Sequence, residues 1–274
     1  MEWSKIKNIV LLILAALNII LLCIVLYRQQ EARRYETELR ASTVAVLADK
    51  GISVDEDTIP WEDRRATHTV RRSLEEEAAL AEQMLGVCQL ADTSPYTYAN
   101  AVGSVRFRTN GEFVLQYEGD SPFGLAEQGA EAVHAGQVLE KLGLAAEIIE
   151  VRNTEGSIVE VSARQVWDSG PLFDCVSVLE YRSGQLRQVS GKRLFGTPDS
   201  GGQQSLTAAS LLMGFMGELV SSGQVCNEIT GVETGYTMTA TLHDAAVLKP
   251  VWYITANTGL FELDAMTGSF KKIT

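Results

Sequence analysis

The chain has 274 residues, a formal net charge of −12 at pH 7 and 46% hydrophobic residues. An acidic balance argues against nucleic acid as a partner, and this apolar content with interspersed charges is not that of a disordered chain. The four cysteines form no C-x-x-C pair, so we predict free thiols and neither a disulfide framework nor a zinc site.

The first predicted element is a transmembrane helix over residues 8–27, which contain no charged side chain. A helix of this length covers roughly 30 Å, the hydrocarbon thickness of a bilayer. A cleaved signal peptide would have a shorter apolar core followed by small residues, whereas Arg28 and a polar run follow here. We therefore expect this helix to lie in the lipid bilayer, with residues 1–7 as a short tail.

One face of this helix is predicted to bind another transmembrane helix. Asn18 lies at the middle of the apolar segment, where an amide without a partner is costly. The residues on its face, at spacings of four and three, are Leu11, Ala15, Asn18, Leu22 and Val25. Small and amide residues on one face are what membrane helices use to approach and hydrogen-bond a neighbour. A hydrogen bond from Asn18 to its own helix backbone is the alternative, and it stays open.

Residues 28–50 favour a helical stalk that continues the membrane helix and ends before Gly51. Lys5 and Lys7 precede the apolar segment, and three arginines follow it within residues 28–34. This count of basic residues alone would place the body inside the cell.

Residues 51–120 form the N-terminal part of the predicted body. Residues 61–70 are a predicted strand, which is unusually basic. Its arginines and those just after it are Arg64, Arg65, Arg71 and Arg72. Two interpretations remain open for them: a solvated face paired with the glutamates at 75–77, or a docking patch for a protein.

Two local patterns in this part are specific. Ser73 followed by Glu76 is a capping box, which predicts a helix over residues 75–85. Asn110-Gly111 between alternating apolar runs predicts a β-hairpin with a type I′ turn, because both turn positions of that type need positive φ.

A helix followed by four strands is then predicted twice. In residues 121–197 the helix is 125–142 and the strands are 147–151, 158–166, 173–181 and 186–194. In residues 198–274 the helix is 206–220 and the strands are 228–232, 236–242, 251–256 and 260–264. Residues 196–204 link these two units. We therefore predict an α+β fold: one N-terminal transmembrane helix and a body of two small units, each an antiparallel sheet with a helix on one face.

No catalytic, cofactor or metal site is predicted. Asp199-Ser200-Gly201-Gly202 is similar to the serine-protease motif, but Pro198 replaces its first glycine and the required two-barrel β architecture is not indicated. The three histidines, His68, His134 and His243, are isolated in the sequence and belong to no metal-binding motif. We expect the chain not to be an enzyme.

The two ends of the chain resemble the YycI family. Its members begin with Met-(Asp/Glu)-Trp-(Ser/Asn)-Lys-x-Lys and a helix containing Leu-Asn-Ile, as residues 1–7 and 17–19 do here. The hairpin at 110–113 and the ending, with Pro-Val-Trp at 250–252 and Asp-Ala-Met-Thr-Gly at 264–268, are similar to the family's central hairpin and its PepSY/YpeB-like C-terminal module. Neither the basic segment 61–72 nor the 198–202 linker has a counterpart in this resemblance.

The resemblance implies a single-pass protein of the cell membrane of a Gram-positive-type bacterium, with a cytoplasmic tail and an extracytoplasmic body. It implies protein–protein interaction with the WalK (YycG) sensor histidine kinase and a YycH-like protein, and hence regulation of the two-component system for cell-wall homeostasis. Family members have neither catalytic residues nor cofactors. The implied orientation is compatible with the basic-residue count, because long domains can be exported against it. A homodimer is left open.

The alternative belongs to another class of function. A PepSY-like module on a membrane anchor would bind or inhibit a secreted hydrolase, or hold a cell-wall ligand, without contacting a kinase.

Overall fold

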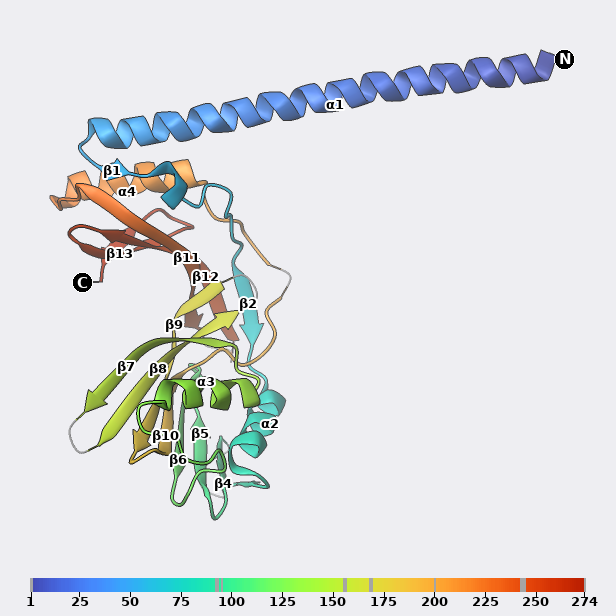
Figure 1. Cartoon of the computed structure of the whole chain (residues 1–274). Helices are drawn as coiled ribbons and strands as arrows, with labels where there is room; N and C mark the ends of the chain where they lie inside the picture. The colour runs from blue at the N-terminus through green and yellow to red at the C-terminus, as the bar shows by residue number, and fades with distance from the viewer. Residues whose placement is uncertain are drawn as a thin grey trace.

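The computed structural model describes residues 2–91, 94, 96–154, 157–167, 170–199, 201–241 and 245–273, and only the backbone of residues 2–6, 8–10, 29, 32 and 33. Helix α1 (Glu2–Asp49) is unbroken, and its N-terminal half projects from the body (Figure 1). The predicted membrane helix and stalk are therefore one helix. Its stretch Leu11–Arg28 is long and apolar enough to span a membrane, and none of it is buried in the protein.

The lower sheet of Figure 1 is antiparallel, in the order β7-β8-β9-β10-β6-β5-β4-β3. Its strands are β3 (Gln89–Leu90), β4 (Thr97–Ala99), β5 (Gly103–Phe107), β6 (Glu112–Tyr117), β7 (Ala146–Thr154), β8 (Ile158–Trp167), β9 (Gly170–Arg182) and β10 (Gln185–Lys192). Helices α2 (Leu74–Leu85) and α3 (Glu131–Lys141) share one apolar core with this sheet, which includes the buried rings of Phe107, Phe113 and Tyr181.

The upper sheet has the antiparallel order β14-β13-β12-β11, with β1 parallel to β11 and β2 antiparallel to the start of β12. Its strands are β1 (Ser53–Val54), β2 (His68–Arg71), β11 (Glu228–Ala240), β12 (Ala245–Ala256), β13 (Gly259–Asp264) and β14 (Phe270–Lys272). Helix α4 (Ala208–Ser222), the short 3-10 helix η1 (Glu56–Thr58) and the end of α1 lie against it. One parallel pair, Leu172 with Tyr236, joins β9 to β11 and so connects the two sheets.

The chain passes from the upper to the lower sheet near residue 72 and returns near residue 196. The two crossing segments, residues 63–72 and 196–205, pair with each other, and we call them together the strap. Isolated bridges join Ala66 to Gln204 and Val70 to Pro198, and Gly202 N–H donates to the Thr67 carbonyl at 2.6 Å. The basic segment and the linker, neither of which has a counterpart in the family resemblance, are thus partners in one structural element.

The arginines of this segment confirm the predicted pairing with residues 75–77 only at Arg72, and there the pair is buried and not on a solvated face. Arg72 forms a buried ion pair with Glu77, at 2.5 and 2.8 Å, and the carboxylate side chain is only 1% exposed. Arg64 donates to the carbonyl of Ser205, and Arg65 binds Asp63. These three side chains stabilise the strap and its neighbours, because each guanidinium binds a carbonyl or carboxylate group of the same chain. The predicted strand also shortens to β2.

The first predicted helix of the repeated pattern begins later than expected. Residues 125–130 are not helical, and α3 starts at Glu131. Leu125 instead bridges to Gln185, and the Ala126 N–H donates to the Gly184 carbonyl at 2.9 Å. A backbone bound to the β9–β10 turn cannot also form helix hydrogen bonds, so the tertiary contact replaces the first turns. The four strands that follow occupy the predicted regions. The first three have longer bounds than predicted, whereas β10 ends two residues earlier, at Lys192.

In the C-terminal part, the strands predicted at 228–232 and 236–242 are one strand, β11, to Ala240; Leu242 lies outside the described residues. Gly235, which falls between the two predicted strands, lies in the middle of β11. A Cβ at Gly235 would lie 2.4 Å from the Pro171 carbonyl oxygen and 2.7 Å from the Phe173 ring. Glycine is needed here because β9 approaches β11 closely, and not because the chain turns.

The two specific local patterns have different outcomes. Ser73 caps α2, since its hydroxyl accepts from the Glu76 N–H at 3.2 Å, which confirms the predicted cap. The hairpin at Asn110 also forms, but only Gly111 in its turn has positive φ (83°), so the turn is not type I′. The Arg108 N–H donates to Glu112 across a three-residue loop with a left-handed glycine, which is the next commonest hairpin form.

Candidate functional site: the two ends of helix α1

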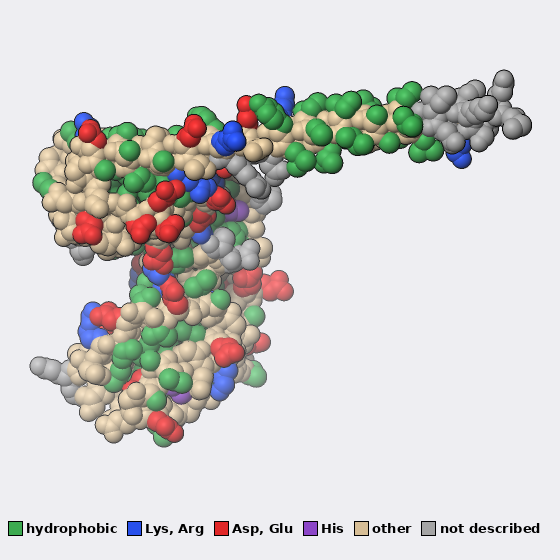
Figure 2. All heavy atoms as spheres, turned by 45° about the horizontal axis from the view of Figure 1, so that its top comes forward, with side chains coloured by type: hydrophobic (Ala, Val, Ile, Leu, Met, Phe, Trp, Pro, Cys, Tyr) green, Lys and Arg blue, Asp and Glu red, His purple; other side chains and the backbone are tan. Residues whose placement is uncertain are grey.

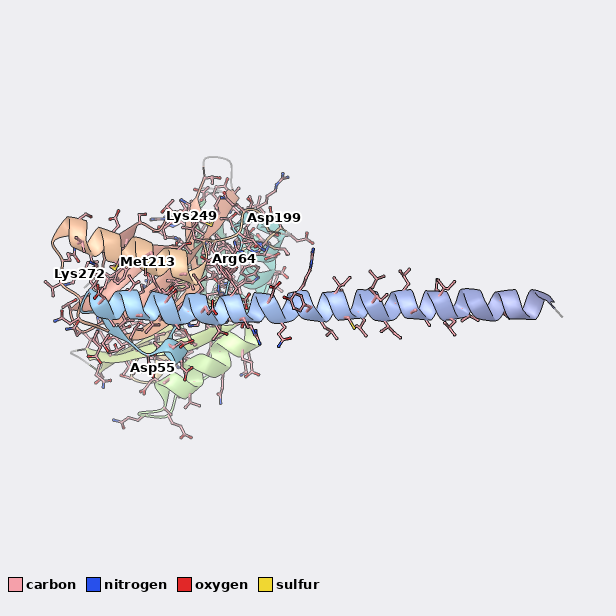
Figure 3. All side chains as sticks on the ribbon, turned by 90° about the horizontal axis from the view of Figure 1, so that it is seen from above. Asp55, Arg64, Asp199, Met213, Lys249 and Lys272 are labelled. Atoms are coloured by element: carbon pink, nitrogen blue, oxygen red, sulfur yellow. The ribbon has the colours of Figure 1, made fainter. Side chains whose placement is uncertain are left out.

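The projecting half of α1, where the membrane segment is predicted and which we call the membrane end, has exposed side chains in every direction along Leu11–Arg28. Figure 2 shows apolar groups along this projecting part, and Figure 3 shows its side chains extending outward on both sides of the helix. The five predicted partner-binding residues, Leu11, Ala15, Asn18, Leu22 and Val25, are all exposed here. The predicted face is thus on the surface and uncovered by the described part of the body.

Asn18 adopts the alternative that the sequence left open. Its Nδ2 donates to the carbonyl of Leu14, one turn earlier, at 2.8 Å. This bond uses one of the two amide hydrogens, and the amide oxygen has no partner among the described residues. An amide that is costly to leave unsatisfied in lipid therefore keeps an acceptor for a neighbouring helix.

The body end of α1 is packed and does not stand free as a stalk. Leu47 is 0% exposed and Thr43, one turn earlier, is 4% exposed. Leu47 belongs to the core of the upper sheet together with Leu211 and Phe215 of α4 and Trp252 of β12. Residues four apart in a helix lie on the same face, so Thr43 and Leu47 form one buried face of α1.

The chain that leaves α1 is bound at once to the upper sheet. The Ile52 N–H donates to the Leu47 carbonyl at 2.9 Å, which closes the end of the helix. The next residue, Ser53, donates to the Asn227 carbonyl at 2.8 Å and starts β1, which pairs with the start of β11. The last turn of α1 is therefore held on both its side and its end.

A groove of about 320 Å³ lies between α1 and the start of α4. Arg40 forms its wall from the helix side: it pairs with Glu62 at 3.0 Å, and its guanidinium lies 5.9 Å from the centre of the Trp61 ring. Trp61 is held by a bond from its indole nitrogen to the Glu56 carbonyl at 3.0 Å. Figure 3 shows the segment with Asp55 on one side of α1 and α4 on the other.

Contacts continue from this groove to the lower sheet through the strap. Arg64, which also lines the groove, donates to the Ser205 carbonyl at 2.9 Å. Arg65 binds the Thr234 hydroxyl on β11 at 3.0 Å. At the other end of the strap, the Gly196 N–H donates to the Glu76 carboxylate on α2 at 2.8 Å. The strap thus connects the base of α1 with a helix of the lower sheet.

The interface between the two sheets is a small cluster of rings and buried apolar side chains. The His68 ring lies edge-on to Trp167 at 4.9 Å and to Tyr236 at 5.9 Å between ring centres, and its Nδ1 is 2.8 Å from the Asp199 carbonyl oxygen. Burial raises the pKa of the nearby Cys175 thiol to about 12, so this thiol stays protonated. These residues join the two sheets by packing.

The residues considered for chemistry lie apart. His134 on α3 is bound to the Tyr181 hydroxyl at 3.0 Å and the Phe123 carbonyl at 3.1 Å, whereas His68 lies against Trp167 and Tyr236 between the two sheets. Ser200 and the dipeptide His243-Asp244 lie outside the described residues. Within the described ranges, no group of three or more His, Cys, Asp or Glu side chains could hold a metal ion, and the cysteines there are free.

Sequence reasoning therefore predicted the apolar, projecting half of α1 as a helix and missed the packing of its other half against the upper sheet. Thr43 and Leu47 recur at a spacing of four, with charged residues on the other faces of this part of the helix. This change from apolar side chains on all faces to apolar side chains on one face is the signal that could have found the packed end. No local pattern pointed to Arg40 and Trp61, which meet across a loop.

Comparison with known proteins adds little to this geometry. No family model and no curated protein matches the chain. Among solved structures, the chain is similar to an uncharacterized protein from Eubacterium rectale ATCC 33656, with 13% identity and a TM-score of 0.46 over 79% of this chain and 89% of that chain. A likeness at this level carries no argument, so function rests on the residues described above.

Proposed function

We propose that this protein is a membrane-anchored regulator of a sensor histidine kinase of the WalK (YycG) type and acts together with a YycH-like protein. In this proposal α1 crosses the cell membrane and the body lies outside it. The observation that carries the proposal is that α1 is one helix: the segment apolar enough for a membrane and the segment buried in the body are continuous. The YycI-like opening at residues 1–7 and 17–19 supports the choice of kinase.

The proposed mechanism is a bias transmitted along a rigid helix. Because the last turns of α1 are held by α4 and β1, a change in the upper sheet rotates or shifts the whole helix, including the face of Asn18. If that face binds the kinase's transmembrane helices differently in the signalling and resting states, only this difference shifts the equilibrium. A difference of about 1.4 kcal/mol changes the ratio of the two states tenfold.

The first experiment is capture of the kinase from membranes. We expect the full chain to co-purify with the kinase and a chain lacking residues 1–28 not to do so. Equal capture by both chains would contradict a role for the membrane helix and would favour the binding-module alternative, in which the body alone holds its target.

A second experiment tests whether α1 acts as a rigid rod. Alanines are inserted after Gln30, between the apolar segment and the packed end. Each inserted residue rotates the Asn18 face by about 100° relative to the body, so two residues should disturb kinase output and seven should nearly restore it. If kinase output did not depend on whether two or seven residues are inserted, the body and the membrane end would not be coupled through α1.

A further inference from the structure

The free edge of the lower sheet is β7. Among the described strands, β7 pairs only with β8. Its side chains after Ala146 are exposed, including Ile148 (36%), Ile149 (47%) and Val151 (47%). Figure 1 shows the β7–β8 hairpin at the outer side of the lower sheet. A row of unpaired backbone N–H and C=O groups with exposed β-branched side chains is a surface prepared for another strand.

The other sheet ends are protected in ways that β7 is not. At the opposite end of the lower sheet, β3 has only two residues, and at the end of the upper sheet β14 has three residues, two of them lysines. β7 has nine residues and contains neither lysine nor proline. It has a bulge between Ile148 and Glu150, but the rest of the strand, from Glu150 to Thr154, pairs regularly with β8.

The sequence of this regular part is complementary to itself. When two copies of β7 run antiparallel with Val151 opposite Val151 of the second copy, Glu150 lies opposite Arg152 of that copy, and Arg152 lies opposite its Glu150. Centring the pair on Glu150 or on Arg152 instead would place like charges opposite each other, which is destabilising. Within one chain these two side chains are half-exposed and 2.9 Å apart, so both charges are accessible at the edge.

We propose that β7 pairs with β7 of a second copy of this chain, antiparallel and centred on Val151, to form a two-fold symmetric homodimer. The pairing supplies partners for the free backbone groups and two cross-strand ion pairs, and it joins the lower sheets of both copies into one. The two-fold axis passes between the two strands at Val151 and makes the contact isologous, so it closes at two copies and does not propagate into fibres.

The test uses charge reversal in the full chain in detergent micelles, with sedimentation to measure the dimer. Glu150→Arg places Arg opposite Arg in the homodimer, and Arg152→Glu places Glu opposite Glu. Each variant alone should dimerise about tenfold more weakly. A mixture of the two variants, with different tags, should associate again, because every cross-strand pair is then of opposite charge. The chain carrying both substitutions should dimerise like the unchanged chain.

Cross-linking in membrane vesicles provides a second readout. With Cys23 and Cys88 replaced by serine, Val151→Cys should cross-link to itself with a short bis-maleimide, whereas the exposed α3 position Val133→Cys should not. An unchanged chain that sediments as a monomer, a dimer indifferent to both charge reversals, or a mixture that fails to associate would each overturn the proposal. A dimer lost on Asn18→Leu but not on charge reversal would place the contact on α1.

Discussion

The two ends of α1 contain similar apolar side chains in opposite surroundings. Leu14, in the projecting half, is 57% exposed, whereas Leu47, in the packed half, is 0% exposed. The protein itself buries Leu47, but the described part of the body provides nothing that could bury Leu14. One continuous helix therefore combines two interfaces, one satisfied within the chain and one that needs lipid or another protein.

The largest expected effect separates these two interfaces directly. Leu47→Ala should lower the free energy of unfolding by about 2–5 kcal/mol, because it removes a fully buried side chain and leaves a cavity. Leu14→Ala should leave unfolding of the body unchanged. Val46→Ala is the matched control, since Val46 is next to Leu47 in the chain but is 40% exposed. Denaturant unfolding of the full chain in micelles, followed by tryptophan fluorescence, measures all three. Equal losses at 46 and 47 would contradict the described packing of α1.

At the membrane end we expect an effect on binding and none on stability. Asn18→Leu should weaken association with the kinase's membrane helices by about 1 kcal/mol, because it removes the amide from the predicted face. Ile20→Leu, on the opposite face, is the control. Quantitative co-purification from membranes measures the loss. If Asn18→Leu left every membrane partner bound as tightly as before, the predicted face would be wrong.

A smaller effect is expected at the groove beside α1. Arg40→Ala removes the ion pair with Glu62, whose side chain is 85% exposed, and the contact with Trp61. Exposed pairs and cation–π contacts are each worth about 1 kcal/mol or less, so the free energy of unfolding should fall by about 1 kcal/mol. Glu36→Ala, on the same groove, should change it less. A loss as large as that of Leu47→Ala would show that Arg40 belongs to the packed interface.

The last prediction concerns the rate at which the Cys88 thiol reacts with a labelling reagent. Burial, and then the charge of Glu82, raise the pKa of the Cys88 thiol above its usual value. Because its thiolate fraction is smaller, Cys88 should react more slowly than an ordinary thiol near pH 8. The rate should then rise as the pH is raised and more of the thiol is deprotonated. Glu82→Gln should increase the rate.

The same label tests the proposed orientation. A reagent that cannot cross membranes should modify Cys88 in intact cells, with Cys88→Ser as the control. Labelling only after lysis would place the body in the cytosol and would contradict the proposed function.

The elements that follow from short stretches of sequence could be predicted. The apolar segment of α1 is too long for the core of a cleaved signal peptide. The Ser73 cap depends only on the next three residues. In the lower-sheet strands, apolar and polar residues alternate with period two. The membrane face of α1 was predicted for the same reason, because helical spacing depends on the residues of one helix alone.

The remaining features depend on segments that meet only in the folded chain. Gly235 falls between two predicted strands until Pro171 is placed against it, and the sequence could not place Arg64 and Arg65 beside Ser205 and Thr234. The start of α3 is set by the β9–β10 turn. The sequence by itself determined where most helices and strands lie and which segment is apolar enough for a membrane, since those properties are local. Only the tertiary structure decided that α1 is fastened to the body and that the strap joins the two sheets, because both need contacts between residues far apart in the chain.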